Sequence, residues 1–364
     1  MSFAIRSLRA RSLRVPLLDP FRIATATLTT TLAEEIELVL EKDGTEQVGL
    51  GEAATLPPVT TETPEEVQRL VPVLEAALKS LRAPWAVDAL TALLDEHLAD
   101  HPVLRAGIET AWLDAFAKHE GRSVAHLIAG STNWLERDFE TDVTIPIASP
   151  ARMGELAAEW VSRGFKSLKV KVGRAHHEDL EALRAIIASA PSARLRLDAN
   201  AVMSATQALH FIEDVRLLGG DLELFEQPCR ADDWQGMAEV TKHAGIPVLA
   251  DESCKTVADV DRIAERRAAS GVNLKLVKHG GVLASLAVAR RAREHGMLLM
   301  AGAMVETRLG LTAMLHLVTV MGVDYLDLDT ALLLTEDPYL DGYRESLPRL
   351  RIDSSRIGLG ISRR

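Results

Sequence analysis

The sequence predicts an α/β protein in which a parallel (β/α) barrel follows a smaller α+β unit. From Thr141 onward, short apolar runs alternate with helical patterns, which gives eight strands and seven intervening helices. Five runs between Ser167 and Lys275 end in charged residues spaced by about 24 to 28 residues, the length of one βα unit. An open doubly wound sheet would be expected to have a Gly-rich phosphate loop after its first strand, and this sequence has none there. The pattern therefore favours a closed barrel.

Residues 1–125 are expected to form the α+β unit. Strand patterns cover the ranges 3–15, 35–41 and 47–52, of which the last two form a hairpin. We expect a mobile loop at 21–31, which has five threonines and little apolar periodicity, and a second loop at 53–61. Helical stripes cover the ranges 64–81, 86–98 and 103–119. Thr63 and Glu66 form a capping-box signature at the start of the first helix.

The barrel is expected over residues 126–334. Its predicted strands cover the ranges 141–147, 167–172, 194–198, 222–226, 246–250, 272–276, 298–302 and 325–328. Helical patterns separate them and include the ranges 149–164, 177–190 and 204–218. The periodicity stops after Leu334, and we expect residues 335–364 to pack back on the N-terminal unit.

The composition excludes several classes of function. A net charge of −11 provides no basic footprint for a nucleic acid. Cys229 and Cys254 are too few for a disulfide framework, and we interpret both as nonreactive. No apolar run approaches the roughly 18 to 20 residues that span a bilayer. We expect a cytoplasmic protein that binds neither membrane nor nucleic acid and forms a homo-oligomer.

Three carboxylates, Asp198, Glu226 and Asp251, stand at consecutive strand ends. The strand ends of a barrel open onto one face, so these acids should converge there. Each alone could cap the following helix. Three together are better explained by a cation, and oxygen-only ligation suits Mg²⁺ or Mn²⁺. Asn200 is a candidate to support the ligands.

Lysines flank these acids in chain order. Lys169 and Lys171 alternate on one strand and share a face, and Lys275 faces the same mouth from across the barrel. A lysine base requires a pKa of roughly 7 to 8 instead of about 10.4. One base on each side of a metal-held carboxylate predicts 1,1-proton transfer, that is, racemisation or epimerisation. Lys166 and Lys278 are expected to face outward.

Asp327 and Asp329 alternate with leucine on the last strand and should share a face at the mouth. Such a pair is suited to bind a substrate ammonium, although a lone acid would be interpreted as a cap. The weaker candidates are His176-His177 on a solvated loop, His279 in a glycine loop, and Glu306, which could face the site.

Five motifs, in order and at matching spacing, resemble the muconate-lactonising-enzyme subgroup of the enolase superfamily. They are Lys169-Val170-Lys171, Asp198-Ala199-Asn200, Glu226-Gln227-Pro228, Asp251-Glu252-Ser253 and Asn273-Leu274-Lys275. The resemblance covers nearly the whole chain. It implies a (β/α)7β modified TIM barrel with an N-terminal α+β capping domain that the C-terminal tail completes.

The resemblance also implies roles for the site residues. The three carboxylates would bind Mg²⁺, with Mn²⁺ as a substitute, Lys171 and Lys275 would be the acid/base catalysts, and Lys169 would neutralise an enolate. The Asp327-Leu328-Asp329 motif and the strand Thr141-Asp142-Val143-Thr144-Ile145 resemble the dipeptide epimerases, whose acids hold the α-ammonium of a dipeptide. The remaining expected site residues are Thr144 and Met304 as substrate contacts and Asn200 and Glu252 behind the metal ligands.

One position departs from the relatives that epimerise L-Ala-D/L-Glu. Those enzymes carry an arginine in the first capping-domain loop, where this chain has Ala26, with Arg22 four residues earlier. The departure argues against Ala-Glu and predicts a hydrophobic or otherwise different second side chain.

Other functions stay open. N-acylamino-acid racemases, muconate cycloisomerases and o-succinylbenzoate synthases belong to the same subgroup but have no free ammonium to bind. A Schiff-base lyase would need a single nucleophilic lysine. A non-catalytic metal-binding module would give no reason for paired lysines.

Overall fold

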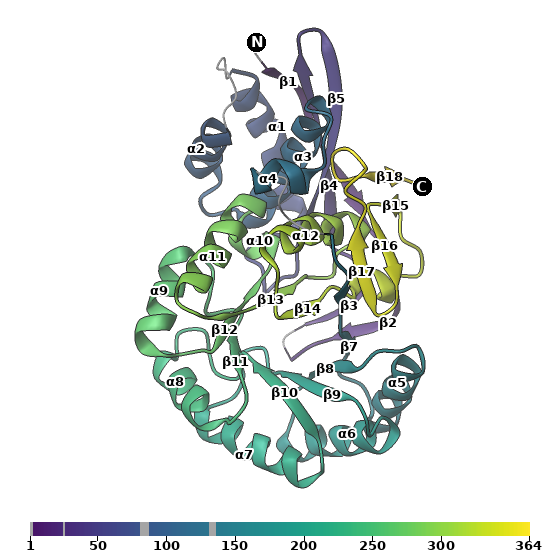
Figure 1. Cartoon of the computed structure of the whole chain (residues 1–364), viewed down its shortest axis with the longest axis vertical. Coiled ribbons are helices and arrows are strands. Elements are labelled where there is room, and N and C mark those ends of the chain that lie inside the picture. The colour runs from purple at the N-terminus through teal and green to yellow at the C-terminus, as the bar shows by residue number, and fades with distance from the viewer. Residues whose placement is uncertain (1–2, 25, 81–86, 131–135) are drawn as a thin grey trace.

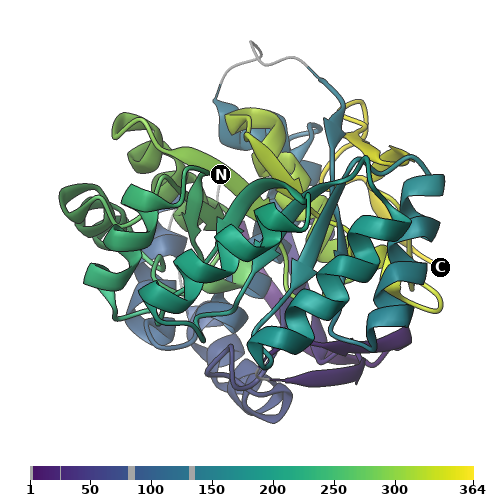
Figure 2. The ribbon, with the colours of Figure 1, turned by 90° about the horizontal axis from the view of Figure 1, so that it is seen from below.

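The computed structural model of the chain describes residues 3–24, 26–80, 87–130 and 136–364. Thr25 of the expected first loop and the predicted helix ends at residues 81 and 86 lie outside the described residues. Figure 1 shows the N-terminal strands and helices at one end of the molecule and the barrel with its surrounding helices at the other. Figure 2, seen from below, shows barrel helices as a layer in front of the strands. Among the described helices, none is long and apolar enough to cross a membrane.

The N-terminal unit combines an antiparallel sheet with helices. The sheet has the order β1-β4-β5, with β1 (Phe3–Leu13), β4 (Ala33–Lys42) and β5 (Thr45–Ala54). The helices are α1 (Pro64–Ser80), α2 (Val87–Leu98), α3 (Pro102–His119) and α4 (Val124–Ala129). Strand β5 lies directly on α3, because a Cβ at Gly51 would stand 2.0 Å from the carbonyl oxygen of Gly107. Only glycine permits so close an approach.

The prediction of a mobile loop at 21–31 is wrong for most of the residues that the structure describes there, because they belong to strands. Strands β2 (Pro16–Arg22) and β3 (Thr27–Thr30) form an antiparallel hairpin there, in which Phe21 pairs with Leu28. Both side chains are buried, which anchors the hairpin. Threonine is β-branched and favours an extended backbone, so the threonine-rich composition predicts a strand better than a loop. The second expected loop is confirmed from Thr55 onward, since β5 includes Ala53 and Ala54.

The barrel is confirmed. Its strands are β7 (Val143–Ile145), β8 (Ser167–Lys171), β9 (Arg194–Asp198), β10 (Asp221–Glu226), β11 (Val248–Ala250), β12 (Gly271–Leu274), β13 (Leu298–Gly302) and β14 (Tyr325–Asp327). Among the described residues these eight form one parallel sheet in chain order from β7 to β14. A parallel bridge between Thr141 and Leu326 joins the two ends.

Helices follow the barrel strands. They are α5 (Pro150–Ser162), α6 (His176–Ser189), α7 (Ala205–Leu217), α8 (Trp234–His243), α9 (Val257–Arg266), α10 (Leu276–His279), α11 (Val282–Glu294) and α12 (Arg308–Met321), with a 3₁₀ turn η1 (Thr330–Leu333). Two predictions are wrong in detail. His176 and His177 open α6 instead of lying on a loop, and His279 is a buried residue of the short helix α10.

The C-terminal tail contacts both parts of the molecule. It contains β15 (Tyr339–Asp341), β16 (Tyr343–Ser346), β17 (Arg349–Ile352) and β18 (Ile361–Arg363), and β17 pairs with β6 (Phe139–Glu140) just before the barrel. The hydroxyl of Tyr339 donates to Glu35 of β4 at 2.5 Å. Arg363 donates to Glu35 at 2.8 Å and to Glu37 at 2.6 Å.

Two buried glutamates of the N-terminal unit cap helices of the barrel. Glu52 of β5 accepts the N–H of Thr307, the N-cap residue of α12, at 3.0 Å and its hydroxyl at 2.6 Å. Glu109 of α3 accepts the N–H of Leu283 at the start of α11 at 2.8 Å. These helix starts follow the C-terminal ends of β13 and β12. The two caps therefore fix the N-terminal unit over that mouth of the barrel.

The protonation of Glu52 makes the stability of this joint depend on pH. Burial and the charge of Glu306 raise the pKa of Glu52 from 4.5 to about 8. Between these values the folded protein holds a proton that the unfolded chain releases, so this group's contribution to the free energy of unfolding falls as the pH rises. Glu52→Gln keeps a side-chain oxygen that can accept hydrogen bonds from Thr307, but the side chain stays neutral at every pH. We expect its melting temperature at pH 8 to equal or exceed that of the wild type and to vary less between pH 5.5 and 8.

Glu52→Ala is the matched control. It removes the acceptors altogether, so it should lose about 1 to 2 kcal/mol at both pH values. Thermal unfolding at pH 5.5 and 8 measures all three proteins. A Glu52→Gln protein that melts well below the wild type at pH 8 would show that the carboxylate form is the one required.

Candidate active site

The predicted site residues gather at the mouth that the N-terminal unit covers. A pocket opens there, and Phe21, Ile23, Leu56 and Val59 supply its wall from the N-terminal unit. Nine predicted site residues line the same cavity: Thr144, Lys169, Lys171, Asn200, Asp251, Lys275, Met304, Asp327 and Asp329. Asp198 and Glu226 contact its lysines, and Glu252 lines a neighbouring cavity.

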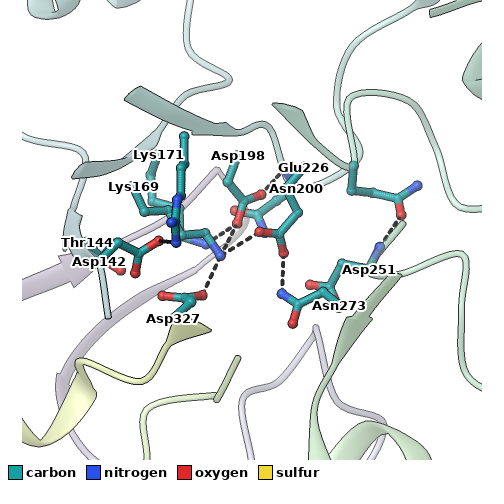
Figure 3. A network of polar contacts seen from close by, with 12 residues as sticks. Asp142, Thr144, Lys169, Lys171, Asp198, Asn200, Glu226, Asp251, Asn273 and Asp327 are labelled. Atoms are coloured by element: carbon teal, nitrogen blue, oxygen red, sulfur yellow. Dashed lines mark hydrogen bonds and ion pairs between the residues drawn. The ribbon is translucent and has the colours of Figure 1, made fainter. Parts of the chain in front are cut away.

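The three predicted carboxylates stand on adjacent strand ends because β9, β10 and β11 are neighbours in register. Asp198 ends β9 and pairs in register with Glu226, which ends β10, while Asp251 directly follows β11. All three are buried. The Lys169 ammonium lies among the acids, 3.1 Å from Asp198, 2.7 Å from Glu226 and 2.7 Å from Asp327. Figure 3 shows Lys169 at the centre of this network.

These contacts decide the charges of the group. Burial lowers the pKa of Lys169, but the surrounding carboxylates outweigh it and raise that pKa well above its usual value. Burial would raise the pKa of Asp198, yet the ammonium groups of Lys171 and Lys169 hold it below its usual value. Burial and the negative charge of Asp198 raise the pKa of Glu226. A buried acid cluster without such positive charge would be strongly unfavourable.

Lys171 and Lys275 stand on opposite sides of the carboxylates. Lys171 of β8 contacts Asp198 at 2.5 Å, and Lys275, which follows β12, contacts Asp251 at 2.8 Å. In the sheet, β9, β10 and β11 lie between the two lysine strands. The lowered pKa expected for a lysine base stays a prediction for Lys275, because a bound divalent cation would contribute to it. Burial lowers its pKa, but Asp251 and Glu226 more than compensate, and the net shift is upward.

Lys278 was missed by the sequence analysis, and its predicted outward orientation is wrong. Its ammonium group donates to Asp251 Oδ1 at 2.7 Å, to the Asp251 carbonyl at 2.9 Å and to the Asn273 carbonyl at 2.6 Å. The side chain of Asn273 in turn donates to Glu226 Oε1 at 2.8 Å. Lys278 comes three residues after Lys275, on the helix that follows the strand, so strand alternation could not have found it. Lys166 is exposed as expected.

The acids of the last strand differ from each other in their contacts. Asp327 is paired with Lys169. Asp329 lies beyond β14 and accepts the N–H of Thr144 at 2.5 Å through Oδ2, while its Oδ1 has no hydrogen-bond partner among the described residues. Burial and the charge of Asp327 raise the pKa of Asp329 to about 6. Asp329 therefore offers the cavity a buried oxygen that no other described group uses.

The remaining predicted residues support the cavity from behind. Asn200 donates its N–H to Asp198 at 3.0 Å and its amide to Glu252 at 3.4 Å. Glu306 does not line the cavity and instead accepts the Met304 N–H at 3.0 Å. Burial raises the pKa of the Cys229 thiol to about 11 and that of Cys254 to about 12, as expected for nonreactive cysteines.

The donor set fits a hard divalent cation. In the described part of the chain, no three His, Cys, Asp or Glu side chains form a ready metal cluster as they stand, and Lys169 lies among the acids instead. The oxygens nonetheless suit Mg²⁺. Glu226 Oε2 meets Lys169 only as an ion pair, and Asn200 Oδ1 has no hydrogen-bond partner among the described residues. Both oxygens are available to a cation.

Fold and site together define an enzyme with buried acids and lysines at the mouth of a parallel barrel. Residues 152–362 match the family described as Enolase C-terminal domain-like. The chain belongs to this family, which confirms the resemblance to the enolase superfamily. Its relatives are named as epimerases, and the chain is accordingly an enzyme of the isomerase class.

Three relatives illustrate the likeness. An L-Ala-D/L-amino acid epimerase of Populus trichocarpa is 39% identical over 359 residues, which covers 95% of this chain and 82% of the relative. An aromatic dipeptide epimerase of Herpetosiphon aurantiacus is 35% identical over 349 residues, or 95% of each chain. A solved dipeptide epimerase of Enterococcus faecalis, in complex with Mg and L-Leu-L-Tyr, has a TM-score of 0.89 at 28% identity and covers 99% of each chain.

Lys169→Met tests the charge balance of the site. The substitution leaves three buried carboxylates without their shared ammonium group, so the metal-free protein should lose about 3 to 5 kcal/mol at pH 8. Added Mg²⁺ should stabilise the variant more than the wild type, since the cation replaces the lost charge. Thermal unfolding in a chelator and with Mg²⁺ measures both effects.

Lys166→Met is the control, because Lys166 directly precedes β8 with its side chain 63% exposed. It should change stability by less than about 0.5 kcal/mol. Wild-type stability of Lys169→Met in the chelator would contradict the proposed balance of charges.

Proposed function

We propose that the chain is a Mg²⁺-dependent dipeptide epimerase that inverts the α-carbon of the C-terminal residue of an L,L-dipeptide. The observation that carries the proposal is the placement of Lys171 and Lys275 on opposite sides of the buried carboxylate cluster, where Lys171 contacts Asp198 and Lys275 contacts Asp251. The names of the relatives support the same reaction and substrate class.

The carboxylates and the two lysines have different roles in the proposed reaction. Asp198, Glu226 and Asp251 would hold Mg²⁺, or Mn²⁺ in its place, which supplies positive charge beside the substrate carboxylate. One of Lys171 and Lys275, in its neutral form, takes the α-proton, and the electron pair of the broken C–H bond moves into the carboxyl group as an enolate. The other lysine, protonated, returns a proton to the opposite face.

The other residues position the substrate. The ammonium group of Lys169 stabilises the negative charge of the enolate. Asp329, with Asp327 beside it, accepts the amino terminus of the dipeptide. Thr144 holds Asp329 through its backbone N–H, and Met304 forms part of the apolar wall.

Epimerisation in D₂O tests the proposal. Incubation of the enzyme with Mg²⁺ and a panel of L,L-dipeptides should introduce deuterium at the α-carbon of the C-terminal residue and produce a D-residue there. Mass spectrometry and proton NMR follow the two changes. The absence of exchange with every dipeptide of the panel would refute the proposed reaction.

Lys171→Ala and Lys275→Ala are the variants for this experiment. Each should reduce epimerisation by about 10²- to 10⁴-fold, because inversion needs both an acid and a base. Each variant should still exchange the α-proton of the one epimer that faces the remaining lysine. Lys166→Met should behave as the wild type. Wild-type turnover by either alanine variant would contradict the two-base assignment.

Asp329→Asn tests the ammonium site. The substitution preserves the shape of the side chain but removes its charge, so KM for free dipeptides should rise by about 10- to 100-fold. N-acetylated dipeptides have no ammonium group and should be poor substrates for both proteins. Efficient turnover of an N-acetylated substrate by the wild type would instead favour an N-acylamino-acid racemase.

A further inference from the structure

A second cavity adjoins the catalytic cavity on its β7 side. Phe21 of β2 and Thr144 of β7 line both cavities and form a shared wall. Helix α5 and the turn η1 supply further lining residues, among them Trp160 and Leu332.

The shared wall stands beside the carboxylate that would hold the substrate ammonium. The N–H of Thr144 donates to Asp329 Oδ2, and Oδ1 of the same group is the buried oxygen without a partner in the described part of the chain. The α-ammonium and the side chain of an amino-terminal residue leave the same carbon. An ammonium on Asp329 would therefore place that carbon near Thr144, which also lines the second cavity. Another cavity lies at Asp251 and Lys278, and neither Thr144 nor Asp329 lines it.

The second cavity has an apolar floor. Leu156 and Trp160 are 8% and 5% exposed and pack beneath it. Leu18 also lines it, with 63% of its surface exposed. A bound apolar side chain would cover that surface and gain the free energy of its burial.

The residues that line the second cavity carry no net charge, so the cavity offers no excess charge to bind an ionic side chain. Asp19 and Glu159 balance Arg152 and Arg163 in number. Arg152 is paired with Asp19 at 2.8 Å, and the guanidinium group of Arg163 stacks over the Trp160 ring at 4.2 Å. The stacked arginine extends the flat surface of the floor.

We propose that this second cavity binds the side chain of the amino-terminal residue of the substrate, and that this residue is a large apolar one such as leucine, methionine or phenylalanine. The inference rests on the proposed dipeptide epimerase function, and it adds a specificity at the end of the substrate that does not react.

The test compares L-Phe-L-Ala with L-Ala-L-Ala, which share the reacting residue. Wild-type kcat/KM should be about 10-fold or more higher for L-Phe-L-Ala, the size expected for filling an apolar pocket. Leu18→Asp should reduce this preference about fivefold and leave L-Ala-L-Ala within twofold. Because Leu18 is exposed, the substitution should leave the protein folded, and thermal unfolding checks this. The control is Leu217→Asp on α7, where the leucine is 84% exposed and outside the cavity.

Binding of both dipeptides to the Mg²⁺-loaded protein is measured by calorimetry alongside turnover. Turnover with equal preference for the two substrates, or a preference that Leu18→Asp leaves intact, would overturn the inference while the epimerase function stands. Tighter binding of L-Phe-L-Ala that Leu18→Asp weakens, without turnover, would support the subsite and refute the reaction. Absence of both binding and turnover would overturn both.

Discussion

The ammonium group of Lys169 is the charge on which the site depends. It lies within 3.1 Å of three buried carboxylates on three separate strands, and no bulk water is present there to reduce their repulsion. The barrel provides the positions, because parallel strands in register all end at the same mouth. Lys171, Lys275 and Lys278 complete the neutralisation from two sides. Three of these four lysines, Lys169, Lys171 and Lys275, are also the groups that the proposed reaction requires.

The sequence predicts the barrel and the converging acids well, for a physical reason. A buried parallel strand is a short apolar run, and a charged residue at its end, such as Asp198 or Glu226, must leave the apolar core at the mouth. The prediction needs only the order and spacing of these runs. The capping box at Thr63 and Glu66 is equally local, and both of its hydrogen bonds are formed.

The errors of the sequence prediction arise where the structure of a residue depends on partners far away in the sequence. Lys278 was assigned to solvent because nothing near it in the sequence shows that Asp251 would accept its ammonium. The hairpin at 21–31 forms because Phe21 and Leu28 find a buried surface, whereas the expectation of a loop came from the weak periodicity of the segment alone.

The contacts of the tail have a consequence for the order in which the chain folds. Glu35 of β4 accepts hydrogen bonds from Tyr339 and Arg363, which lie 304 and 328 residues further along the chain. During synthesis from the N-terminus, β4 is therefore made long before its partners exist, and the whole barrel must be produced in between. Until then Glu35 has Arg11 of the neighbouring strand as a partner. The sheet of the N-terminal unit is thus among the first parts to be synthesised and among the last to be completed.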